Sequence, residues 1–256
     1  MPGYVDTLYV TWRSPQTRTI HVVGRLRFDD VAKRYDFVYV GAVHRAIPEG
    51  FSPFPEFPEL DRLYRSANLF PLFANRLMSK GRADRAAWLV ALGLENDEPH
   101  PIQVLSRTGG TRLTDHLELI PVPEEINGAF VTYFLVRGIR HMVSSDKIEE
   151  RIDRLRPGEV LHCKHDAENP VDPLTCMIYT TQSERIGYVP AYLAPDIHKC
   201  EQHGGRIDIV VHQVNRPPAE AHHRLLCKVV AYWPEGMRPL DSIDYVPIHE
   251  SLILAG

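Results

Sequence analysis

Residues 169–173 read Asn-Pro-Val-Asp-Pro and constrain the fold of this chain more than any other stretch. They lie between two short apolar runs, Val160–Cys163 and Cys176–Tyr179, which have the length and composition of β-strands. An amide and a carboxylate beside two prolines make a rigid polar turn. We therefore expect a fixed polar corner between two strands, a kind of exposed feature that often binds a ligand.

Short strand-like runs recur along the whole chain. They are predicted at 7–12, 19–28, 35–40, 116–120, 130–137, 186–190, 207–214 and 225–233. Helical apolar spacing is found at 69–77, 84–94, 146–155 and 191–202, and a further helix is expected from Pro101 to the Gly109-Gly110 pair. The fold class is therefore predicted as mainly β with α (α+β), and the strands of the second half suggest a closed or partly open barrel.

Residues 121–128 read Pro-Val-Pro-Glu-Glu-Ile-Asn-Gly, which is the composition of a linker. We therefore predict two domains, 1–124 and 125–256. Earlier in the chain, residues 47–58 carry four prolines and three phenylalanines, Phe51, Phe54 and Phe57. These rings either form a peptide-docking face or pin the loop to its own domain. The second interpretation is favoured because large exposed apolar patches are uncommon.

Composition narrows the class of protein. The 256 residues carry a net charge of −4, which argues against a protein that coats duplex DNA through a basic surface but leaves room for a small local site. The four cysteines lack a Cys-x-x-Cys pair, as expected of reduced structural thiols. No signal segment and no membrane-spanning apolar run is visible, so we expect a cytoplasmic protein without a membrane partner.

Four short motifs follow one another in the second half: Gly138-Ile-Arg-His141, Leu155-x-Pro-Gly-Glu159, Asn169-Pro-x-Asp-Pro173 and Ile186-Gly-Tyr-Val-Pro190. In this order and spacing they resemble the HIRAN domain over roughly residues 129–235. The resemblance implies an SH3/OB-like β-barrel that binds single-stranded DNA, often at a free 3′ end. In that mode aromatic rings stack on bases while polar and basic groups hold the phosphates and the terminal hydroxyl.

The resemblance also implies which residues contact nucleic acid. They are Arg140, His141, Asn169, Asp172, Tyr188 and Tyr192. Arg140 matches a phosphate-contacting arginine, and Asp172 is placed to accept a hydrogen bond from a sugar hydroxyl. His141 and Val171 stand where DNA-binding members of the family carry tyrosines, and Pro190 and Ala191 fall near positions that can carry lysines. The alternative for Asn169 and Asp172 is that they only cap a turn, which is their commonest use.

The first half resembles the N-terminal subdomain of HipA-type toxin kinases, through Gly24-Arg-Leu26, Tyr35–Tyr39, Leu69–Leu77 and Leu92-Gly-Leu94. This resemblance implies a β-rich module that packs on a kinase core. The 256 residues contain no Gly-rich phosphate loop and no metal-binding Asp-Phe-Gly element, so we expect no enzymatic activity. An alternative function is a regulatory or antitoxin-like subunit that docks on a separate kinase, and a helicase or nuclease is a further possible partner.

Three other patterns suggest chemistry, each with a structural alternative. His198-x-Cys200-x-x-His203 carries zinc-ligand types, but its spacing does not share one helix face. Thr108–Arg112 either forms an anion-binding nest or caps a helix. Asp166 and Glu168 either form a carboxylate pair or are solvated loop residues. We favour the structural alternative in each case and expect no metal and no cofactor.

Overall fold

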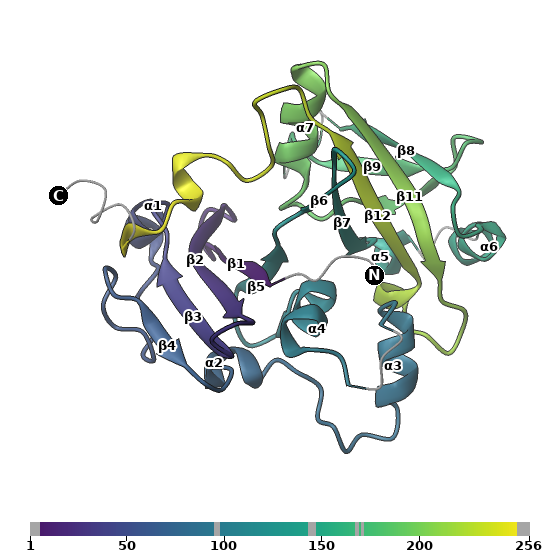
Figure 1. Cartoon of the computed structure of the whole chain (residues 1–256). Helices are drawn as coiled ribbons and strands as arrows, with labels where there is room; N and C mark the ends of the chain where they lie inside the picture. The colour runs from purple at the N-terminus through teal and green to yellow at the C-terminus, as the bar shows by residue number, and fades with distance from the viewer. Residues whose placement is uncertain (1–5, 95–97, 143–146, 167–168, 170–171, 250–256) are drawn as a thin grey trace. The chain divides into compact units, whose positions relative to one another are not determined.

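A computed structural model of the protein describes residues 6–94, 98–142, 147–166, 169 and 172–249 (Figure 1). Contacts divide the chain into two compact units. The first unit consists of Met1–Arg82, Glu98–Val122 and Leu240–Gly256, and the second unit of Ala83–Asp97 and Pro123–Pro239. Both are mainly β and each is built on an antiparallel sheet, which confirms the mainly β fold class with helices. The two-domain division at residue 124 stays a prediction.

The first unit is built on a five-stranded sheet in the order β4-β3-β2-β1-β5. Its strands are β1 Thr7–Arg13, β2 Ile20–Asp29, β3 Arg34–Tyr39, β4 Tyr64–Ser66 and β5 Leu117–Pro121. Its helices are α1 Val43–Ala46, α2 Pro71–Ala74 and α4 Pro101–Thr108. The predicted helix at 69–77 is therefore too long. The chain beyond Ala74 continues only in tight turns, with Arg76 N–H donating to Phe73 O and Leu77 N–H to Ala74 O.

The proline-rich loop is fixed to the core of the first unit. Phe51, Phe54 and Phe57 are all buried in that core. Tyr39 holds the loop at two points, because its hydroxyl donates to Phe57 O and accepts from Phe54 N–H, both at 2.8 Å. Burial raises the pKa of Tyr39, so this hydroxyl stays protonated. The interpretation that the phenylalanines pin the loop is confirmed.

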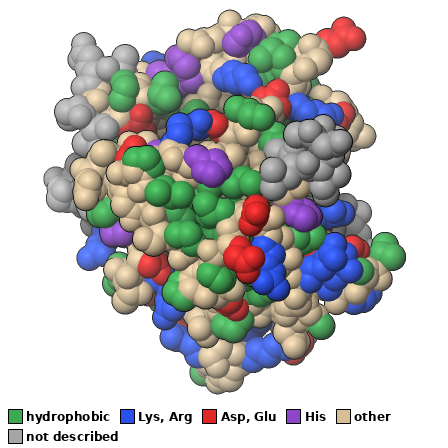
Figure 2. Space-filling model, turned by 90° about the vertical axis from the view of Figure 1, so that its left-hand side faces the viewer, with side chains coloured by type: hydrophobic (Ala, Val, Ile, Leu, Met, Phe, Trp, Pro, Cys, Tyr) green, Lys and Arg blue, Asp and Glu red, His purple; other side chains and the backbone are tan. Residues whose placement is uncertain are grey.

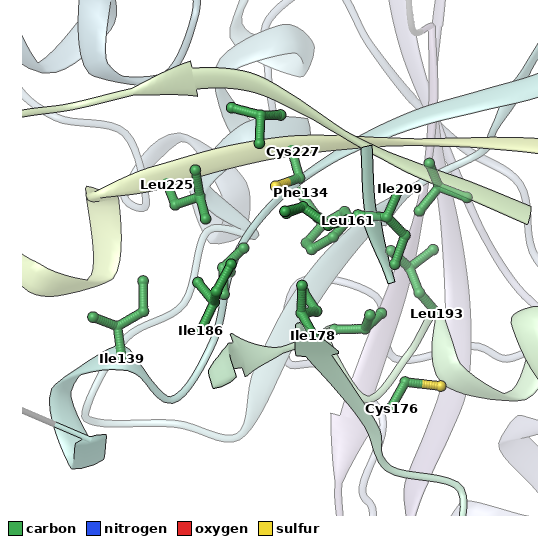
Figure 3. Packing of buried hydrophobic residues seen from close by; sticks show 14 of the residues in the cluster. Phe134, Ile139, Leu161, Cys176, Ile178, Ile186, Leu193, Ile209, Leu225 and Cys227 are labelled. Atoms are coloured by element: carbon green, nitrogen blue, oxygen red, sulfur yellow. The ribbon is translucent and has the colours of Figure 1, made fainter. Parts of the chain in front are cut away.

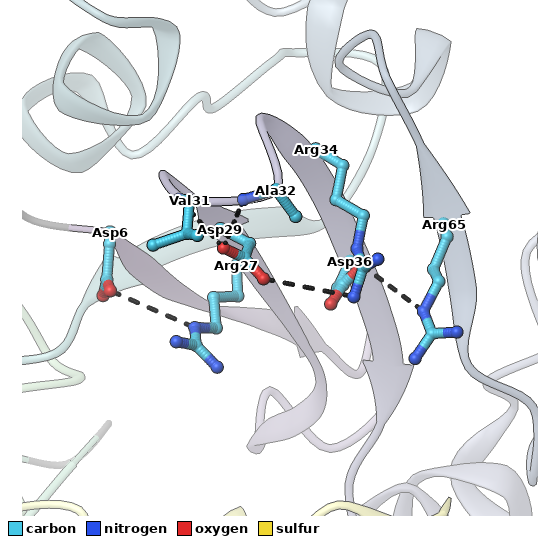
Figure 4. Close-up of polar contacts among 8 residues, drawn as sticks. All are labelled: Asp6, Arg27, Asp29, Val31, Ala32, Arg34, Asp36 and Arg65. Atoms are coloured by element: carbon cyan, nitrogen blue, oxygen red, sulfur yellow. Dashed lines mark hydrogen bonds and ion pairs between the residues drawn. The ribbon is translucent and has the colours of Figure 1, made fainter.

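Charged side chains on the first unit's sheet neutralise one another (Figure 4). Asp36 Oδ1 lies 3.1 Å from Arg34 Nε and 3.9 Å from Arg65 Nε. At the turn after β2, Asp29 Oδ1 accepts from Val31 N–H and Ala32 N–H. The bond from Ala32 is the main reason that the pKa of Asp29 is lowered. Arg27, Arg34 and Arg65 of this sheet thus lie at ion-pair distance from carboxylates.

The second unit is built on a seven-stranded sheet in the order β10-β9-β8-β11-β12-β7-β6. Its strands are β6 Glu124–Ile126, β7 Ala129–Leu135, β8 Val160–His165, β9 Cys176–Tyr179, β10 Arg185–Tyr188, β11 Arg206–Val214 and β12 Leu225–Tyr232. Its helices are α3 Arg85–Ala91, α5 Ile139–Met142, α6 Ile148–Arg154 and α7 Ala194–Gln202. The predicted linker at 121–128 is wrong in its second part, because Glu124–Ile126 pairs with β7 across a turn at Asn127-Gly128.

The predicted barrel is not closed in the part of the chain that the structure describes. β10 and β6 are the two edges of the sheet, and among the described residues the backbone pairing between β10 and the chain beyond β7 is limited to the bridge between Arg137 and Tyr188. The next residue, Gly138, has φ +79° and turns the chain into α5, so the pairing does not extend. Inside the curved sheet lies one apolar core that includes Phe134, Leu161, Ile178, Ile186 and Ile209 (Figure 3).

Candidate nucleic-acid interface

A row of side-by-side residues crosses one end of the second unit's sheet. The pairs are Lys164 with Met177, Met177 with Tyr188, and Tyr188 with Arg137. Directly paired residues of antiparallel strands project to the same face. This row therefore places two cations and a tyrosine on one side of the sheet, with the buried Met177 between Lys164 and Tyr188.

Two glycines allow this close assembly. A Cβ on Gly138 would lie 2.5 Å from Tyr188 Cδ2, so the tyrosine ring covers the backbone of Gly138. A Cβ on Gly187 would lie 2.6 Å from Arg137 O and 2.5 Å from Val136 Cγ1. All three distances are shorter than real Cβ contacts show, and only glycine permits them. The Gly-Ile-Arg and Ile-Gly-Tyr motifs are therefore two sides of one contact.

Arg140 is exposed in α5, the short helix that packs on β10. Within the described part of the chain its guanidinium has no carboxylate at ion-pair distance, and neither does that of Arg185 or the ammonium group of Lys164. Arg140, Arg185 and Lys164 therefore differ from the arginines of Figure 4, which lie at ion-pair distance from carboxylates. An uncompensated exposed arginine is the kind of group that holds a phosphate.

The polar corner is fixed by its own side chains. Asn169 Oδ1 accepts from Asp172 N–H at 3.2 Å, and Asp172 Oδ1 accepts from Leu174 N–H at 2.9 Å. The backbone is closed by Thr175 N–H donating to Asp172 O. Asn169 and Asp172 thus cap the turn, as the alternative interpretation expected. Capping engages one oxygen of each side chain, and Asp172 retains a second carboxylate oxygen.

The structure brings some of the predicted site residues together. Arg140 lies on α5, which packs against β10, the strand that carries Tyr188. The corner leads into β9, which pairs with β10. Tyr192 is partly buried and packs against the hydrophobic core, and its predicted contact with nucleic acid stays a prediction. The side chain of His141 and residue Val171 lie outside the described residues, so the predicted stacking positions there stay predictions.

Two histidine clusters near this end were not found from the sequence. His165, directly before the corner, has Nε2 3.2 Å from both His198 Nδ1 and Glu201 Oε2, and Nδ1 3.5 Å from Cys176 Sγ. The cluster ties the strand before the corner to α7. The 3₁₀ turn Ala221–His223 contacts α5, and burial is the main cause that lowers the pKa of His223 to about 4.

The structure describes two of the three remaining patterns. Cys200 Sγ donates to Tyr232 O and His203 Nδ1 lies 2.8 Å from Lys199 O, so these two side chains contact backbone carbonyls rather than each other. Among the described residues, no three or more His, Cys, Asp or Glu side chains are arranged to hold a metal ion. Gly109 ends α4 by donating to Leu105 O, which is a helix cap. Glu168 lies outside the described residues, so the carboxylate pair is not tested.

On the face that Figure 2 presents, Lys and Arg side chains are interspersed with Asp and Glu, which fits a small local site better than an extended basic surface. Among the described helices we find none whose length and apolar content would suit a bilayer crossing.

Comparisons with known proteins give distant similarities. No family model and no curated protein matches the chain. A crystal structure of a protein from Lactobacillus plantarum is 19% identical, with a TM-score of 0.33 over 40% of this chain and 89% of that chain. The HIRAN domain of human HLTF is 16% identical, with a TM-score of 0.28 over 41% of this chain and 73% of that chain. Neither similarity assigns a family, and the resemblance of the first half to HipA-type kinases stays a prediction.

Proposed function

We propose that the protein is a non-enzymatic cytoplasmic nucleic-acid-binding protein that recognises single-stranded DNA at a free 3′ end. The site is the end of the second unit's sheet, formed by Arg140, Tyr188 and the corner residues Asn169 and Asp172. Arg140 holds a phosphate, the Tyr188 ring stacks on a base, and Asp172 accepts a hydrogen bond from the terminal sugar hydroxyl. Handling of free DNA ends would suit a role in DNA repair or in defence against mobile elements.

One observation carries this proposal. The backbone bridge between Arg137 and Tyr188 holds the segment that bears the exposed Arg140, which has no acidic partner among the described residues, against the strand that bears an aromatic ring. A positive group beside an aromatic ring is the arrangement that single-strand binding requires, because the strand presents phosphates and unstacked bases together. The fixed corner on the adjoining strand supplies a polar acceptor with a defined position.

Asp172 is the residue that should make the site prefer a strand with a 3′-hydroxyl end. A 3′-phosphate brings negative charge to the carboxylate, whereas a 3′-hydroxyl brings a donor. The two ends should therefore differ in affinity, and the difference should shrink as salt screens the charges.

The test is fluorescence anisotropy with 5′-labelled single strands that end in a 3′-hydroxyl or a 3′-phosphate, over a salt series, with a blunt duplex as control. We expect the 3′-hydroxyl strand to bind most tightly and the duplex most weakly. Affinity should fall with salt at a slope of about −0.7 per phosphate contacted. Equal affinity for the two ends would remove end recognition but leave single-strand binding. Failure to bind any single strand at low salt would contradict the proposal as a whole.

A further inference from the structure

The outer face of β8, β9 and β10 continues the surface on which Tyr188 lies. β8 alternates strictly, with Val160, His162 and Lys164 exposed and Leu161 buried between them. His162 pairs with Tyr179, and Tyr179 pairs with Arg185. Ile186 forms a bulge in β10, so Arg185 and Tyr188 both project outward while Ile186 is buried in the core.

This outer face combines cations with an aromatic ring. Lys164 Nζ lies 5.3 Å from the centre of the Tyr179 ring, which confirms that both side chains project from the same side of the sheet. Lys164 and Arg185 flank that ring from the two neighbouring strands, and within the described residues neither has an acidic partner at ion-pair distance. The flexible stem of Lys164 allows its ammonium group to leave the ring for a phosphate while a base takes its place.

We infer that Lys164, Tyr179 and Arg185 form a second contact track, which binds the part of a single-stranded nucleic acid that lies on the 5′ side of the bound end. This inference rests on the proposed function and adds the path of the strand to it. Adjacent strands lie about 4.8 Å apart, so the track extends roughly 10 Å from Tyr188 across β9 to β8. That reach corresponds to a few nucleotides, and the contacts are to phosphates and base faces without regard to sequence.

The alternative occupant of a basic face is an acidic protein segment. Charge alone would attract such a segment, but the Tyr179 ring between the two cations favours a ligand whose charges alternate with flat π-faces. A single-stranded nucleic acid has this alternation in every residue. A run of glutamates has the charge without the flat faces.

A length series of labelled strands with a 3′-hydroxyl tests the track. A three-nucleotide strand occupies the end site alone, whereas an eight-nucleotide strand also covers the track. The test variant is Lys164→Ala with Arg185→Ala. The control is Lys33→Ala with Arg62→Ala, which removes the same number of charges from exposed side chains that are paired with Asp30 and Glu59, each at 2.7 Å.

For the wild type we expect the eight-nucleotide strand to bind about tenfold more tightly than the three-nucleotide strand. The test variant should reduce this ratio to about twofold and should lower the salt slope of the longer strand by about 1.4, for two lost phosphate contacts. Its affinity for the three-nucleotide strand should fall by less than its affinity for the eight-nucleotide strand. Tyr179→Leu should reduce the ratio without changing the slope, because it removes stacking and keeps the charge.

The outcomes separate the track from the end site. If the wild type binds both strands and the test variant has the same ratio of affinities for the two lengths, the track is contradicted and the end site is not. Wild type that binds neither strand overturns both. A glutamate octapeptide that competes as well as the eight-nucleotide strand, with Tyr179→Leu having no effect, would show simple charge attraction and overturn the track as a nucleic-acid contact.

Discussion

Tyr188 and Arg137 exchange both backbone hydrogen bonds, with Arg137 N–H donating to Tyr188 O at 2.9 Å and Tyr188 N–H donating to Arg137 O at 2.8 Å. This pair joins the edge strand β10 to the chain that leaves β7, which is otherwise paired at the opposite side of the sheet. It therefore fixes where α5 begins and where Arg140 lies. The proposed interface depends on this contact.

Gly138→Ala should disrupt the contact between α5 and Tyr188. Alanine at φ +79° is strained, and its Cβ would meet Tyr188 Cδ2 at 2.5 Å. Gly158→Ala is the matched control, because Gly158 also has a positive φ, +89°, but no atom lies near its added Cβ. We expect the control to lose about 1–2 kcal/mol of unfolding free energy and Gly138→Ala to lose roughly 1–3 kcal/mol more. Urea denaturation measures both, and equal losses would contradict the packing of Tyr188 on Gly138.

Asp172→Asn and Asp172→Ala separate turn capping from ligand binding. Asparagine keeps the Oδ1 that accepts from Leu174 N–H but removes the charge, so the stability of this variant should stay near that of the wild type. Alanine removes the acceptor and should cost about 0.5–1.5 kcal/mol. Asp172→Asn should nevertheless bind a 3′-phosphate strand more tightly than the wild type does, because the repelling carboxylate is gone. An unchanged preference for the hydroxyl end would show that Asp172 only caps the turn.

His223 should make stability fall in mild acid. Its pKa is about 4 in the folded protein, against about 6.5 in an unfolded chain. Between these values the unfolded chain binds more protons, so stability is lost as pH falls from about 6.5 toward 4. Because the ring is half-buried, we expect a loss on the order of 1 kcal/mol by pH 5. His223→Gln should lose less stability between pH 7.5 and pH 5 than the wild type does, as measured by urea denaturation at the two pH values.

Tyr39→Phe should loosen the proline-rich loop of the first unit. The substitution keeps the ring but removes the hydroxyl that serves Phe54 N–H and Phe57 O. Leaving these buried backbone groups without a partner should cost about 1–3 kcal/mol of unfolding free energy. Amide exchange of Phe54 N–H should accelerate in the variant. Unchanged protection of that amide would mean that the buried phenylalanines alone hold the loop.

Local pattern was enough to predict most elements of the second unit. β11, β12 and α7 begin and end within a few residues of the predicted ranges, because apolar periodicity and the flanking Pro and Gly residues are local signals. β6 was missed because Pro121 and Pro123 resemble a linker, although Asn127-Gly128 is a hairpin signal. The periodicity also predicted α3. The side chains of Gln213 and Asn215 donate hydrogen bonds to the last carbonyls of α3. Local pattern could not predict these bonds, because the residues that make them are distant in sequence.

The candidate site was also predicted only in part, because contacts between residues distant in sequence leave no local signal. The motifs indicated Arg140, Tyr188 and the corner as separate features, and the capping roles of Asn169 and Asp172 were already an alternative on the sequence. Sequence distance did not indicate that Gly138 packs under Tyr188, because that packing follows from the bridge at Arg137. The cluster around His165 was missed for a similar reason, since its partners come from β9 and α7.

The most direct test of single-strand binding at this end of the sheet is the dissociation constant of an eight-nucleotide 3′-hydroxyl strand for wild type and Arg140→Ala, measured by anisotropy at two salt concentrations. Arg140 is exposed, so the variant should keep the stability of the wild type within about 0.5 kcal/mol. We predict about tenfold weaker binding and a salt slope smaller by about 0.7. Equal affinities and equal slopes for the two proteins would contradict the account.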